Sequence, residues 1–238
     1  MIALLRYQSA ILLRSHRWIF PLIAYAVLVG AAGAGGGDNP LSGGLGWSAA
    51  MLVPVVAFLT RSMLTAEPDA ARACVAAAAG PVKAQVAALL TAVGGGAVLA
   101  IAGAALELVL SDSVLRTPAS PSVWDKLTAT ASHPKVLLAG LATALVCLLV
   151  ASAVGALLNP PLLRHPGLAI LSTLTAVIVA LASDVSPAGA ALRHSGTSSG
   201  PDWPGTGSFI AAICLVAVTW TASSLAAARR DNRSPSIS

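Results

Sequence analysis

Long apolar stretches separated by short polar segments dominate this sequence. We find six of them, each close to the roughly 20 mainly apolar residues that a helix needs to cross a membrane. None of them alternates polar and apolar positions, as membrane β-strands do. The pattern therefore predicts an all-α, polytopic membrane protein with six transmembrane helices. The expected spans cover residues 19–36, 44–63, 84–110, 136–158, 168–183 and 207–228.

The composition supports a membrane protein and excludes several other classes. Hydrophobic residues make up 56% of the 238 residues, and only 10% are charged. Average globular domains carry about 25% charged residues. A soluble fold of this size would have too little polar surface to cover such a core. A soluble domain, a disordered chain and a coiled coil are therefore excluded, and the net charge of +5 is not taken to indicate a nucleic-acid partner.

The positions of the basic residues indicate how the six spans are oriented. An excess of Lys and Arg on the cytoplasmic side is the usual signal of membrane topology. With both termini in the cytoplasm, only four of the fourteen basic residues fall in outer loops: Arg116, Lys126, Lys135 and Arg193. The other ten lie in inner segments: Arg6, Arg14, Arg17, Arg61, Arg72, Lys83, Arg164, Arg229, Arg230 and Arg233. We expect one transmembrane domain over residues 1–228, with a short cytoplasmic tail over residues 229–238.

The fifth apolar stretch is short. It is closed by Ser183 and Asp184 and followed by Pro187, so it need not cross the whole membrane. Residues 184–206 are rich in Gly, Ser and Pro and are predicted to form an outer loop, and the pattern leaves open whether this loop is re-entrant. The third stretch, by contrast, is long enough to tilt or to extend beyond the bilayer.

The first apolar stretch has two interpretations. Residues 32–34, Ala-Gly-Ala, loosely resemble the cleavage site of a signal peptide. Against this, the basic region that precedes the stretch is long and runs to Trp18, where Arg14, Arg17 and Trp18 are typical of an interfacial anchor. We therefore expect the stretch to be retained as the first span.

The N-terminal segment, residues 1–18, has the pattern of an interfacial helix. At 100° per residue, Arg6, Arg14 and Arg17 fall on one narrow stripe that would face anionic head groups. The alternative is a plain basic flank of the first span. Two apolar stripes run beside the basic one, the first formed by Leu4, Tyr7 and Ile11 and the second by Leu5 and Leu12.

A short helix is predicted between the second and third spans. Glu67 and Asp69 suit the positive end of a helix dipole, and Pro68 suits the first turn. Gly80 followed by Pro81 is a stop signal. The alanine-rich segment between these signals would form about three turns of helix on the cytoplasmic side. A segment that only connected two spans would not need a strongly helix-forming sequence with its own start and stop signals.

The spans contain little that could perform chemistry. Glu107 is the one clear ionisable residue at membrane depth, and it is either an intramembrane polar site or a side chain that snorkels to the head groups. The residues that precede the three lysines, namely Val82, Asp125 and Pro134, exclude the Gly-Lys-Ser/Thr of a phosphate-binding loop. No catalytic residue, metal site or cofactor is therefore expected in this chain. A membrane-embedded enzyme is the least favoured class.

The three cysteines predict no disulfide framework. Cys74 falls in the first inner loop, and Cys147 and Cys214 fall inside apolar spans, where we expect both to be buried. No Cys-x-x-Cys motif and no Cys/His cluster is present, so a zinc site is not supported.

The order of these parts resembles the membrane subunit, or permease, of bacterial ABC transporters of the ABC-2 exporter type. Those subunits have an N-terminal elbow helix, six spans, cytoplasmic termini and a coupling helix between spans two and three. The local resemblance lies in Glu67, Arg72 and the segment Pro81-Val82-Lys83. A further acidic residue and a Gly-Thr step of the family are replaced here by the alanines of residues 76–79.

The resemblance implies a location in the bacterial plasma membrane and a set of partners. ATP and Mg²⁺ would bind a separate ATP-binding ABC subunit, and the permease would pair with a second copy or a sister permease. A lipophilic or amphiphilic substrate would move outward through that pair. The residues expected to couple to the ATPase are Glu67, Asp69, Arg72, Ala77 and Lys83. The main alternative is a membrane anchor, assembly factor or regulator that transports nothing.

Overall fold

The structure is a computed structural model that describes residues 1–16, 18–33, 41–110, 134–157, 166–183, 185–195 and 203–231. All regular elements within these ranges are α-helices. The helices up to the middle of the chain are α1 (Ile2–Arg14), α2 (Ile19–Gly33), α3 (Leu41–Leu64), α4 (Asp69–Ala79) and α5 (Pro81–Leu110). The remaining ones are α8 (Pro134–Leu157), α9 (Pro166–Ala182), α10 (Pro187–Ser195) and α11 (Thr206–Asp231).

Helices long and apolar enough to cross a membrane indicate a membrane protein. Among the described residues, four helices meet this condition alone, namely α3, α5, α8 and α11. Two bent pairs would raise the number to six if each counted as one span. In the first pair α1 and α2 meet at 71°, and in the second α9 and α10 meet at 44°. The all-α class is confirmed, with four to six candidate spans.

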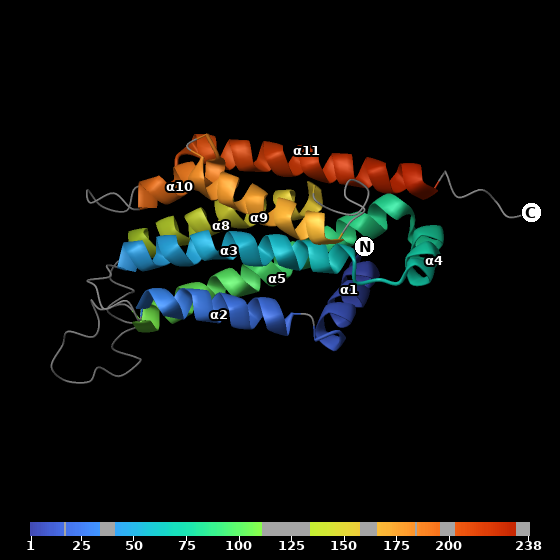
Figure 1. Cartoon of the computed structure of the whole chain (residues 1–238), viewed down its shortest axis with the longest axis horizontal. Coiled ribbons are helices and arrows are strands. Elements are labelled where there is room, and N and C mark those ends of the chain that lie inside the picture. The colour runs from blue at the N-terminus through green and yellow to red at the C-terminus, as the bar shows by residue number, and fades with distance from the viewer. Residues whose placement is uncertain are drawn as a thin grey trace, which may run out of the picture.

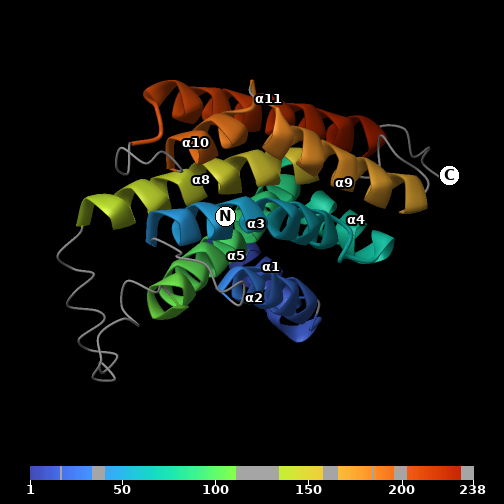
Figure 2. The ribbon, with the colours of Figure 1, turned by 60° about the vertical axis from the view of Figure 1, so that its left-hand side comes forward.

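Helix α3 forms the centre of the bundle. It packs against α8 on one side and against α2 and α5 on the other (Figures 1 and 2). Two glycines on its neighbours allow this close approach: a Cβ on Gly155 of α8 would lie 2.7 Å from the Ala57 carbonyl oxygen, and one on Gly96 of α5 would meet Val56. The fully buried apolar side chains of α3 include Leu52, Val53 and Val56.

Three contacts fix the antiparallel register of α2 and α3. The Phe20 ring lies 5.8 Å from that of Phe58. Farther along the pair, the Tyr25 hydroxyl donates to the Ser48 carbonyl at 3.2 Å. The indole N–H of Trp47 donates to the carbonyl of Leu28 at 3.0 Å. The buried Tyr25 hydroxyl and the exposed Trp47 indole thus both find a hydrogen-bond acceptor on the neighbouring helix.

The two ends of the bundle differ. Helices α1 and α4 and the C-terminal end of α11 lie at one end, which we call the α1–α4 end, and α10 lies near the other (Figure 1). The described part of the expected tail, up to Asp231, continues α11 as helix, and residues 232–238 lie outside the described residues. Both chain-terminal helices thus reach the same end, as an even number of spans requires.

Two expectations need correction. The segment expected to be an outer loop, residues 184–206, contains helix α10, which is seated against α8 and α11 through the fully buried Ala188 and Ala191. Small side chains one turn apart let this short helix pack closely despite its polar flanks. The second correction concerns Cys214, which is exposed, whereas Cys147 is buried as expected. Only 22% of the apolar window of α11 is buried, so most of that helix faces outward.

Candidate functional site

Helix α4 is a short helix at the α1–α4 end of the bundle. It begins after Pro68 and ends at Gly80, whose N–H donates to the Ala76 carbonyl at 2.8 Å. Gly80 has φ 88°, a conformation that residues with a side chain rarely adopt. Because α5 begins at Pro81, this single glycine is all that separates the two helices. The two helices therefore follow each other directly along the chain.

The Glu67 carboxylate ties the segment before α4 to the N-terminal helix. Its Oε1 accepts a hydrogen bond of 2.8 Å from the amide nitrogen of Gln8 on α1. The Gln8 side chain is only 2% exposed and the Glu67 side chain is half-buried, so the contact is partly shielded from water. Sequence analysis did not single out Gln8. The available signal was its place one turn before Leu12, on the stripe of α1 that packs into the core.

Arg72 ties α4 itself to the end of α3. Its guanidinium donates to the carbonyl oxygen of Leu64, the last residue of that helix. The last carbonyls of a helix have no partner within the helix, and an arginine is a common way to satisfy one. Arg72 therefore caps the end of α3 and fixes α4 relative to it. Its guanidinium points inward, toward the last residue of α3.

The other residues expected to couple to the ATPase are Ala77, Lys83 and Asp69. Ala77 and Lys83 are exposed. Asp69 is the first residue of α4, and its side chain lies outside the described part of the structure. The outward face of α4 consists of small side chains at helical spacing: Ala70, Ala73, Cys74, Ala77 and Ala78. We call this surface the α4 face.

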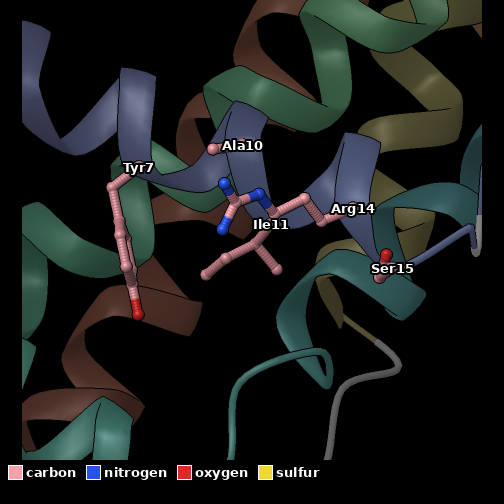
Figure 3. Close-up of a pocket in the computed structure, with 5 residues that line it drawn as sticks. All are labelled: Tyr7, Ala10, Ile11, Arg14 and Ser15. Carbon is pink, nitrogen blue, oxygen red and sulfur yellow. The ribbon is translucent and has the colours of Figure 1, made fainter.

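The expected basic residues of α1 are only partly described. Arg6 and Arg14 are exposed, as is Ala10 between them, while Arg17 lies outside the described residues. The two apolar stripes of α1 face different surroundings. Leu12 of one stripe packs against the core. Tyr7 and Ile11 of the other line an open cavity of about 360 Å³ together with Ala10, Arg14 and Ser15 (Figure 3).

Glu107 lies away from this end, in the last turns of α5, and is 5% exposed. Its carboxyl oxygen Oε2 would lie 2.5 Å from a Cβ placed on Gly44 of α3, so the missing side chain of Gly44 makes room for it. One turn earlier on α5, Gly103 makes room in the same way for the Tyr25 hydroxyl. Among the residues that the structure describes, none forms a hydrogen bond with Oε1 of Glu107. This burial is the opposite of what snorkelling toward head groups requires.

Comparison of the chain with protein-family models, with curated proteins and with solved structures finds no match.

Proposed function

We propose that this chain is the membrane-spanning permease subunit of an ATP-driven exporter, with a separate subunit that binds and hydrolyses ATP. In this proposal the two bent pairs complete six spans, and the α1–α4 end faces the cytoplasm of a bacterial cell. Two permeases, identical or paired with a sister chain, dock on two ATPase subunits. A lipophilic or amphiphilic substrate then moves outward between them. The charge bias of the basic residues favours this orientation.

The geometry of α4 carries the proposal. A helix that transmits a push must be stiff, must present a surface to its partner and must be joined to the spans at both ends. Alanine has the highest helix propensity, which favours a stiff α4. The Arg72 guanidinium joins α4 to α3, and Gly80 joins it directly to α5. Small side chains leave the α4 face free to seat in a cleft of an ATPase.

The inward contacts of Glu67 and Arg72 refine the proposed mechanism. Both residues were expected to contact the ATPase, yet Glu67 accepts from Gln8 and Arg72 donates to Leu64. We assign them to the transmission of movement within the permease. Contact with the ATPase falls to the α4 face and to Lys83, which is exposed. Closure of the ATPases on ATP would then move α4, α3, α5 and α1 together.

The first test is purification of the full chain from its native membrane under mild conditions. We expect an ATPase subunit with a phosphate-binding loop to co-purify, and we expect ATP hydrolysis to require that subunit. Repeated purification without any ATPase would favour the anchor or regulator instead.

The second test is a bulky substitution on the α4 face. Ala77→Trp would clash with a cleft but would hardly disturb a helix in solvent, so we expect normal insertion and loss of stimulated ATPase activity of the complex. Ala105→Trp, on the exposed side of α5 toward its other end, is the matched control and should retain that activity. If Ala77→Trp retained full activity, α4 would be a connector and the proposal would lose its main support.

A further inference from the structure

The open cavity on α1 has an apolar floor and one cationic side. It is lined by one face of the helix, with Tyr7, Ala10, Ile11, Arg14 and Ser15 at successive turns. Figure 3 shows the Arg14 guanidinium turned back along the helix toward Ala10 and Ile11, with the Tyr7 ring on the far side of them. No hydrogen bond or ion pair within the described part of the chain occupies that guanidinium.

The last carbonyls of α1 have contacts other than the Arg14 side chain. The Ile11 carbonyl accepts from the Ser15 N–H at 2.9 Å, and the Leu12 carbonyl accepts from the Ser15 hydroxyl at 3.1 Å. The Leu13 carbonyl accepts from the Trp18 indole at 3.3 Å, and the His16 ring lies 3.0 Å from the Arg14 carbonyl. These contacts close the end of the helix and leave the Arg14 side chain available to an outside acceptor.

We propose that this cavity binds one anionic phospholipid. The guanidinium of Arg14 would hold the phosphate through charge-assisted hydrogen bonds, and the phenol of Tyr7 could donate a further one. The floor formed by Ala10 and Ile11 would receive the start of an acyl chain. A free phosphate ion would leave that floor uncovered, which is why we assign the site to a lipid.

The position of α1 favours a lipid from the same membrane. The helix lies at the end of the bundle and meets α2, the start of the first expected span, at 71°. A helix in this place would lie along the membrane surface, where one apolar stripe faces the protein and the other faces lipid. The Leu12 stripe is the one that packs against the protein. The Tyr7–Ile11 stripe is left for lipid, and anionic lipids attract the adjacent Arg14.

Arg6 provides a matched control for this site. It lies on the same helix and is exposed like Arg14. It carries the same charge but does not line the cavity. Simple attraction between a basic helix and an anionic surface would depend on both arginines, whereas a built site would depend on Arg14 far more strongly.

The experiment uses the full chain in nanodiscs that contain phosphatidylglycerol and phosphatidylcholine in equal amounts. Retained lipids are counted by native mass spectrometry after mild extraction. We expect one phosphatidylglycerol to stay with the wild type, and about ten-fold weaker retention in Arg14→Gln, as the loss of a charged hydrogen bond predicts. Arg6→Gln should behave as wild type, and Arg14→Lys should restore part of the binding. Thermal unfolding of each variant confirms that it is folded.

Several outcomes would overturn the proposal. Equal losses in Arg14→Gln and Arg6→Gln would show general attraction of charge, and equal retention of phosphatidylcholine would show that the negative charge is not recognised. Release of the lipid by inorganic phosphate, but not by chloride at the same ionic strength, would point to an ion site. Because none of these measurements involves an ATPase, the proposal can fail while the exporter function stands, and the reverse also holds.

Discussion

Gln8 donates a 2.8 Å hydrogen bond from its side-chain amide to the carboxylate of Glu67, a residue 59 positions later in the chain. This contact joins the N-terminal helix to the segment that leads into α4. The Gln8 amide is nearly shielded from water, and the Glu67 carboxylate is partly buried. Loss of the amide would leave this carboxylate without that donor. The bond therefore links α1 to the segment before α4.

Gln8→Ala should lower the free energy of unfolding by about 1.5–3 kcal/mol, the usual worth of a hydrogen bond to a charged group. Ser9→Ala is the matched control, because the Ser9 hydroxyl donates to the Arg6 carbonyl of its own helix. Unfolding is measured in mild detergent, together with Glu67→Ala and the double variant. A double variant whose loss equals the sum of the two single losses would show that the two side chains do not interact.

The close packing of α3 and α8 predicts that Gly155 cannot be replaced by alanine without cost. The added Cβ would lie 2.7 Å both from the backbone oxygen of Ala57 and from the Cβ of Thr60. Backbone cannot move aside as a flexible side chain can, so Gly155→Ala should destabilise the protein by about 1–3 kcal/mol. Gly94 meets nothing within 4 Å. Gly94→Ala should therefore be neutral or stabilise α5 by up to about 1 kcal/mol. Similar melting temperatures for the two variants would contradict the packing.

The sequence predicted where most of the helices lie, and α10 is the exception. The expected first-loop helix is present as α4, between the predicted start at Pro68 and stop at Gly80. Such boundaries depend on local backbone chemistry, which a sequence displays directly. The helix at Pro187 was missed because its apolar face consists of a few alanines, too few to raise the hydrophobicity of residues 184–206 above that of a loop.

The pattern could not show which neighbour each side chain contacts. Glu67 and Arg72 were expected to face a partner, and the structure turns both toward other parts of the chain. Charge and spacing identify polar residues near a helix terminus, but the acceptor of Arg72 lies eight positions away and the donor to Glu67 lies on another helix. In the same way, the position of Cys214 along its span does not show whether the side chain faces the core or the outside of the bundle. These relationships depend on tertiary packing.

The three cysteines test the orientation and the packing together. A membrane-impermeant maleimide should label Cys74 only after intact cells are permeabilised, because the α1–α4 end is proposed to be cytoplasmic. A lipid-soluble maleimide should also reach Cys214, which is exposed on α11, but not Cys147, which is fully buried. Single-cysteine variants identify the labelled residue. Labelling of Cys74 in intact cells would reverse the orientation and remove the basis for a coupling role of α4.

The carboxyl of Glu107 predicts an unusual response to an apolar substitution. One of its oxygens has no hydrogen-bond partner within the described ranges, and such a buried atom carries a desolvation cost of about 1–3 kcal/mol. Glu107→Leu, which removes that atom at similar volume, should therefore leave the melting temperature unchanged or raise it. Gly44→Ala should lower it, because the new Cβ would lie 2.5 Å from the carboxyl oxygen. This loss should disappear when Glu107 is also changed to Ala.

A Glu107→Leu variant that unfolds more easily than wild type would show that the carboxyl holds the helices together. If the variant is instead stable but transports less, the carboxyl is kept for function, since a residue that only lowers stability needs another reason to be there.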